Sequence, residues 1–119
     1  MGQHLPSRAI RRFMLNITVC EPIGDWDDCR IRVAASILSE HFGCNVQGEL
    51  ISTLYGSDRR GGMMLLENAQ RAPKTRRPGL LSTRICAGEL EVMRFEVVAL
   101  PIYAYDGITQ WCLVGTFRL

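Results

Sequence analysis

Apolar residues recur at helical spacing near the start of the chain and at every second position soon afterwards. The first pattern predicts a short N-terminal helix over about residues 6–14, with an apolar stripe on one side and arginines on the other. The stripe consists of Ile10, Phe13, Met14 and Ile17, and the arginines are Arg8, Arg11 and Arg12. Alternation over residues 15–20 then predicts a first strand.

A second alternating run, over residues 29–35, predicts a strand that pairs with the first across a turn at 24–28. Ser36 is then placed to cap a helix over residues 37–42. Gly43 follows this helix and can end it in a left-handed conformation, which costs glycine little.

Two more short helices are predicted before the chain returns to strands. The first covers residues 49–55 and ends at Gly56. Ser57 or Asp58 is placed to cap the second. Pro73 should prevent this helix from continuing, because proline lacks the N–H that a helix interior needs.

The remainder of the chain predicts an antiparallel meander. Its strands cover residues 80–86, 90–104 and 109–119. Ala87-Gly88 and Asp106-Gly107 are the hairpin signals between them, and a change in alternation near Val92 and Met93 predicts a bulge. The whole order predicts an α+β domain, with a five-stranded antiparallel sheet and short helices on one face.

The last predicted strand has two partly apolar sides. We expect Trp111, Leu113 and Phe117 to face the core. Cys112 and Val114 then lie on the outer side, where they favour an interface with a second copy of the chain.

Length and charge narrow the possible functions. The 119 residues fit one domain, and 14 basic against 12 acidic residues give a net charge of +2, far below the excess typical of a dedicated nucleic-acid binder. A local basic segment, residues 71–77, keeps a nucleic-acid-binding accessory protein as an alternative. No aromatic residue is interleaved in this segment to stack bases, so nucleic acid is not the expected partner.

The cysteines and histidines do not suggest a metal site or a disulfide framework. The five cysteines are scattered without a C-x-x-C spacing, which favours buried free thiols. The N-terminal stretch lacks a signal-peptide core, and no apolar run reaches the ~20 residues that span a bilayer. We therefore expect a cytoplasmic protein without a membrane partner.

Several segments, taken in order, resemble the PAS fold, and specifically the compact bacterial single-domain PAS group. These are LPSRAI (5–10), CRIRVAAS (29–36), SEHFGCNVQGELISTLY (39–55), VVALPIYAYDG (97–107) and WCLVGTF (111–117). The likeness covers nearly the whole chain, so residues 1–119 are interpreted as a single PAS-like domain. It implies a sensory or regulatory role, through a small molecule or through contact with another protein.

The resemblance leaves the cofactor unknown. Ile51 stands where flavin photoreceptors of this fold carry their reactive cysteine, and His41 lies outside the helix that resembles the haem-ligating one. A small apolar ligand would occupy a cavity between the sheet and the helices, unless a filled core takes that space. The candidate lining residues are Val33, Ile37, Leu50, Leu54, Leu65, Phe95, Val97 and Leu113.

We assign no catalytic residue. A small α+β enzyme acting on an apolar substrate is an alternative that rests on residue type alone, at Tyr55, Asp58 and Tyr103. Glu40 and His41 are adjacent on a helix and point apart, so they do not form a dyad. The expected partners are a second copy of the chain, which makes a homodimer, and a separate output protein.

Overall fold

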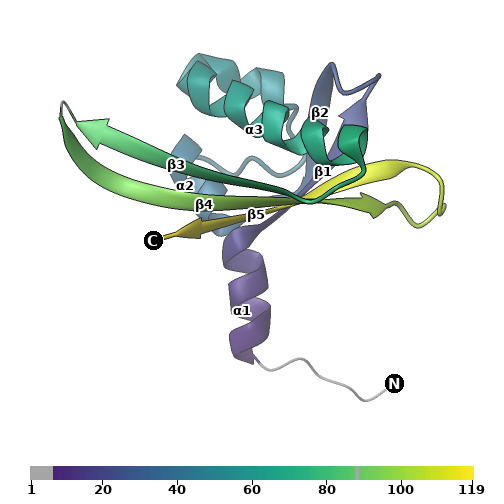
Figure 1. Ribbon diagram of the computed structural model, residues 1–119, viewed down its shortest axis with the longest axis horizontal. Coiled ribbons are helices and arrows are strands. Elements are labelled where there is room, and N and C mark those ends of the chain that lie inside the picture. Colours follow the sequence, from purple (N-terminus) through teal and green to yellow (C-terminus); the bar gives the residue numbers. More distant parts are fainter. Residues whose placement is uncertain (1–6, 88) are drawn as a thin grey trace.

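The computed structural model describes residues 7–87 and 89–119 (Figure 1). The chain passes through helices, a short 3-10 helix and strands in an order that matches the prediction. The elements are α1 (Ser7–Asn16), β1 (Ile17–Ile23), β2 (Asp28–Val33), α2 (Ser36–Phe42), the 3-10 helix η1 (Ile51–Leu54), α3 (Tyr55–Thr75), β3 (Gly79–Ala87), β4 (Leu90–Tyr103) and β5 (Gln110–Arg118).

The strands form one antiparallel sheet in the order β2-β1-β5-β4-β3. The last strand therefore lies in the middle and joins the N-terminal hairpin to the C-terminal meander. The predicted α+β class and five-stranded antiparallel sheet are confirmed. The predicted bulge is confirmed as well, because Ile85 pairs with Met93 and Cys86 pairs with Glu91, which leaves Val92 as the extra residue.

The turns follow the sequence signals in part. Gly43 has a φ of 76° and ends α2 in the left-handed conformation, as predicted. Asp106 organises the β4–β5 turn, since its carboxylate accepts hydrogen bonds from the N–H groups of Ile108 and Thr109. Gly88, in the other hairpin signal, lies outside the described residues, although β3 and β4 are antiparallel neighbours on either side of it.

The helices after β2 cover one face of the sheet, which we call the inner face. Its buried residues pack with apolar side chains from α2, η1 and α3 in one cluster. The strand members are Cys20, Cys29, Ile31, Val97, Ala99, Cys112 and Val114. The helical members are Phe42, Ile51, Leu54, Leu65, Ala69 and Ala72.

The prediction for the two sides of β5 was wrong. Cys112 and Val114 are fully buried on the inner face, next to Cys20 and Thr18 of β1, with which they pair. Trp111, Leu113 and Phe117 lie on the opposite face, which we call the outer face. The error has a physical cause: both sides of this strand are apolar, and alternation alone does not tell which side the helices cover.

The third helix is longer than predicted. Gly56 lies inside α3, which continues through a kink at Asp58, where φ and ψ are −152° and 90°. Asp58 caps the part after the kink, as predicted, because its carboxylate accepts the Gly61 N–H at 2.9 Å. Ser36 does not cap α2; its hydroxyl instead donates to the Met14 carbonyl oxygen at 3.3 Å.

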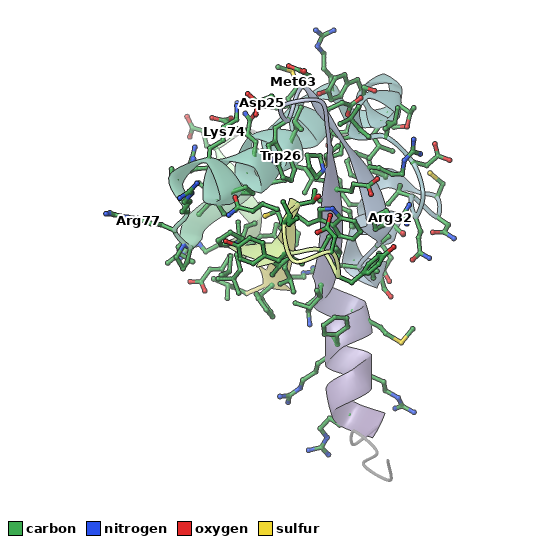
Figure 2. The ribbon with its side chains drawn as sticks, turned by 90° about the vertical axis from the view of Figure 1, so that its right-hand side faces the viewer. Asp25, Trp26, Arg32, Met63, Lys74 and Arg77 are labelled. Carbon is green, nitrogen blue, oxygen red and sulfur yellow. The ribbon has the colours of Figure 1, made fainter. Side chains whose placement is uncertain are left out.

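Pro73 does not stop α3 either. It is buried in the last turn of a helix that ends at Thr75, so burial of the ring outweighs the loss of one hydrogen bond close to the end. The first five residues of the basic segment 71–77 are therefore helical, although Pro73 was predicted to prevent the helix from continuing. Lys74 and Arg77 project from this end of the helical layer, away from α1 (Figure 2).

Core packing predicts a clear contrast between two aliphatic strand residues. Ile31→Ala should lower the free energy of unfolding by about 2–5 kcal/mol, because it leaves a cavity in the packed cluster. Leu80→Ala should cost less than about 0.5 kcal/mol, because Leu80 is 71% exposed. Urea unfolding followed by circular dichroism measures both, and equal losses would contradict the assignment of the inner face.

Candidate functional site

The predicted cavity residues do not come together around one space. Leu54, Leu65 and Val97 are buried in the packed cluster. Where α3 faces β3 and β4, the described residues leave a space of about 10 Å³. A space of this size scarcely holds one water molecule. The close packing of these three residues favours a filled core, the alternative to a cavity, in this part of the protein.

The other predicted residues lie in three different places. Val33 is 37% exposed at the end of β2, and Leu50 is half-buried in an isolated bridge to Arg30. Leu113 lies on the outer face, opposite Leu100. Ile37 and Phe95 line an open groove beside α1.

This groove, which we call the α1 groove, has a volume of about 950 Å³. It lies where α1 meets β1, between α2, the end of β5 and the part of β4 that pairs with that end. Its apolar lining comes from Phe13, Leu15, Ile17, Ile37, Phe95 and Phe117. Its polar lining comes from Arg12, Asn16, Glu40, His41 and Arg118.

One hydrogen bond links the two helical walls of the α1 groove, and a second lies within α1. The Ser36 hydroxyl ties the start of α2 to the carbonyl oxygen of Met14. The Asn16 side chain donates to the Arg12 carbonyl oxygen at 3.0 Å and so holds the last turn of α1. Beyond this point, α1 projects away from the sheet and from the other helices (Figure 1).

A side-chain hydrogen bond joins α2 to α3 next to the α1 groove. His41 Nε2 lies 2.7 Å from Asp58 Oδ2. The Gly61 N–H bond and then the His41 bond lower the pKa of Asp58 below its ordinary value. Gly61 is required for this approach, because a Cβ there would overlap the Asp58 carboxylate. The amino-acid sequence carries no signal for this pair, since no local spacing relates positions 41 and 58.

The residues considered for catalysis have separate surroundings. The Tyr55 ring packs close to Gly62 within α3, and Asp58 pairs with His41. Tyr103 is 64% exposed at the end of β4, and its hydroxyl accepts a hydrogen bond from Gln110. The described geometry thus gives Asp58 a structural partner and Tyr103 a solvent-facing position.

Three thiols are buried together on the inner face. Cys20, Cys29 and Cys112 are fully buried free cysteines, as predicted, whereas Cys44 is exposed. The thiol hydrogen bond with Cys29, followed by burial, raises the pKa of Cys20, and burial raises the pKa of Cys112 to about 12. The described residues contain no group of three side chains suited to hold a metal ion.

The central part of the outer face is apolar, and none of the described helices lies over it (Figure 1). Its apolar members are Ile17, Val19, Leu80, Val98, Leu100, Ile102, Trp111, Leu113 and Phe117, and Glu96 lies beside Phe117 at its margin. Arg32 borders this surface, with its guanidinium 5.8 Å from the Trp111 ring centre. Among the described helices, none has the length and apolar character needed to cross a bilayer.

The comparisons with known proteins agree with this architecture. No protein-family model matches the sequence, and no curated protein matches it. Several solved structures are similar. A domain of an HTR-like protein from Haloarcula marismortui has a TM-score of 0.60 at 8% sequence identity. The match covers 87% of this chain and 97% of that domain. The PAS domain of BvgS from Bordetella pertussis has a TM-score of 0.58 at 16% identity, covering 94% and 82%.

VqmA from Vibrio cholerae, a LuxR-type receptor, has a TM-score of 0.64 at 11% identity. The match covers 98% of this chain and 52% of VqmA, so the chain corresponds to about half of that protein. At these identities the likeness concerns the fold, and the fold is that of PAS domains. The resemblance found in the sequence is thereby confirmed at the level of fold.

The buried thiols predict selective alkylation. Iodoacetamide should modify Cys44 in the folded protein and modify Cys20, Cys29 and Cys112 only after unfolding. Burial keeps the reagent away from all three thiols, and the raised pKa values of Cys20 and Cys112 also keep those two protonated. Peptide mass spectrometry after short pulses measures each site. Labelling of Cys112 as fast as Cys44 would contradict the packing of the inner face.

The His41–Asp58 pair predicts a pH effect of known sign. Because the folded-state pKa of Asp58 lies below its ordinary value of 3.8, its contacts stabilise the fold above that pH and lose this contribution as the pH falls through the lowered value. His41→Ala should raise the pKa of Asp58 only part of the way, since the Gly61 N–H bond remains.

Carboxyl carbon NMR titration measures this change. Asp106 is the internal control, because the Thr109 hydroxyl and neighbouring N–H groups, rather than His41, lower its pKa. An unchanged pKa of Asp58 in the His41→Ala variant, or an equal shift at Asp106, would refute the coupling.

Proposed function

We propose that this chain is a sensory and regulatory module that acts through contact between proteins, first of all by forming a homodimer. The observation that carries the proposal is the uncovered outer face. Its side chains are largely apolar across β1, β5 and β4, and no described helix lies over them. Removing such a surface from water contributes roughly 25 cal/mol per Å² of apolar area.

The position of α1 supports a second copy as the occupant of the outer face. Phe13, Met14 and Leu15 are exposed on a helix that stands away from its own sheet (Figure 1). α1 runs directly into β1, whose residues Ile17 and Val19 belong to the outer face. An exposed helix continuous with an exposed apolar face suits a reciprocal, two-fold contact, in which each copy covers the other.

A sensory role further implies a separate output protein that reads the state of this domain. The PAS fold and its neighbours support this view, and the VqmA structure is described as that of a dimer. The exposed, unpaired Cys44 and the buried free thiols suit a reducing, cytoplasmic compartment.

Catalysis and nucleic-acid binding are outside the proposal. The residues considered for catalysis lie in separate surroundings, and Tyr103 faces solvent. Within the basic segment, Arg71 pairs with Glu67 at 3.5 Å on the same helix, which reduces the charge available for phosphates.

A charge placed on the outer face should separate the two copies. Leu100 is 37% exposed on β4, opposite Leu113 of the central strand, so Leu100→Glu should change the protein from dimer to monomer at tens of micromolar while the fold is retained. Met63→Glu is the matched control, because Met63 is an exposed apolar residue on α3, on the helical side of the molecule (Figure 2).

Sedimentation equilibrium measures the mass of all three proteins, and circular dichroism checks their folding. The wild type and the Met63→Glu variant should sediment as dimers. A monomeric wild type, or a Leu100→Glu variant that remains dimeric, would overturn the proposed pairing.

A further inference from the structure

The α1 groove combines an apolar lining with two positively charged side chains. Arg12 enters it from α1, and Arg118 enters it from the end of β5. In the part of the chain that the structure describes, neither arginine forms an ion pair. Glu40 is the one acidic side chain in the lining, so the two arginines leave an excess of positive charge around an apolar space.

We propose that the α1 groove binds an apolar monocarboxylic acid, with its hydrocarbon part on the aromatic and aliphatic side chains and its carboxylate at Arg12 and Arg118. The groove is distinct from the space between α3 and the sheet, which is filled. Its volume of about 950 Å³ lies at the upper end of the range typical of small-molecule sites.

The charged side chains around the groove favour a ligand with one negative charge over a ligand with two. Arginine binds carboxylates through directed, charge-assisted hydrogen bonds. Glu40, on the α2 wall, would repel a second anionic group. His41 is already engaged, because its Nε2 contacts Asp58. Phe13, Ile37, Phe95 and Phe117 offer apolar contacts only, which suit a hydrocarbon chain.

A ligand in the α1 groove would contact α1 and α2, the two helices through which binding can affect the proposed signalling surfaces. α1 forms one wall and also carries the exposed apolar residues proposed to meet a second copy. α2 forms the other wall, and its His41 is tied to the start of the capped part of α3. The proposal rests on the sensory role inferred above, but the site lies within one copy and does not require pairing.

Isothermal titration of the full chain with sodium decanoate, kept below micelle formation, tests the site. The wild type should bind decanoate, and the double variant Arg12→Gln/Arg118→Gln should bind it about tenfold or more weakly, as loss of a charge-assisted contact implies. The matched control is Arg8→Gln/Arg11→Gln, which removes two charges from α1 outside the lining and should stay within about twofold of wild type.

A neutral probe separates charge recognition from general apolar binding. Decan-1-ol should bind the wild type more weakly than decanoate, and the Arg12→Gln/Arg118→Gln variant should no longer distinguish the two. Amide NMR shifts caused by decanoate should centre on Ile37, Phe95 and Phe117. Absent binding, equal affinity in the two double variants, or shifts centred on Leu81 and Ala99 would overturn the proposal.

The same titration on Leu100→Glu keeps the two proposals apart. Decanoate should bind this variant at least as tightly as the wild type, because Leu100 does not line the groove and loss of pairing leaves the shared lining residues Ile17 and Phe117 accessible. If Leu100→Glu becomes monomeric but no variant binds decanoate, the groove proposal fails and the pairing stands. If decanoate binds through the two arginines while the wild type is monomeric, the pairing fails and the groove stands.

Discussion

The pairing of β1 with β5 is the interaction on which the rest of the structure depends. This contact pairs residues 17–20 with residues 112–115. It makes the last strand the centre of the sheet. The paired inner residues, Thr18 with Val114 and Cys20 with Cys112, are all fully or almost fully buried. Small side chains at these positions let the helical layer approach the sheet closely. The Thr18 hydroxyl also accepts the Ala35 N–H, which places the start of α2.

This central pairing gives the sheet two apolar faces, of which the helices after β2 cover only one. The buried residues of the inner face pack with the helices in one apolar cluster. The surfaces available for function therefore lie elsewhere. One is the outer face, and the other is the α1 groove, where the end of β5 meets the base of the N-terminal helix. Both surfaces include residues from β5, so the strand that completes the fold also contributes to both candidate sites.

α2 connects the α1 groove to the helical layer. One end of this helix is tied to α1 through Ser36 and Met14, and its last turn is tied to α3 through His41 and Asp58. Asp58 in turn caps the part of α3 that follows the kink, through the Gly61 N–H. These contacts are contiguous, and each is made by a polar group that is partly accessible to solvent. They provide a physical route by which an occupant of the groove can bias the helical layer, without any change in the packed core.

The amino-acid sequence by itself determined the features that depend on near neighbours. Alternation located the strands, Gly43 and Asp58 marked a helix end and a cap, and the change of phase near Val92 marked the bulge. The order of these features was sufficient for the PAS resemblance. Only the tertiary structure decided which side of β5 is buried, that Pro73 stays within α3, and that His41 meets Asp58. The reason is physical: each of these outcomes depends on how distant elements pack, and a strand that is apolar on both sides carries no local signal for the side that helices will cover.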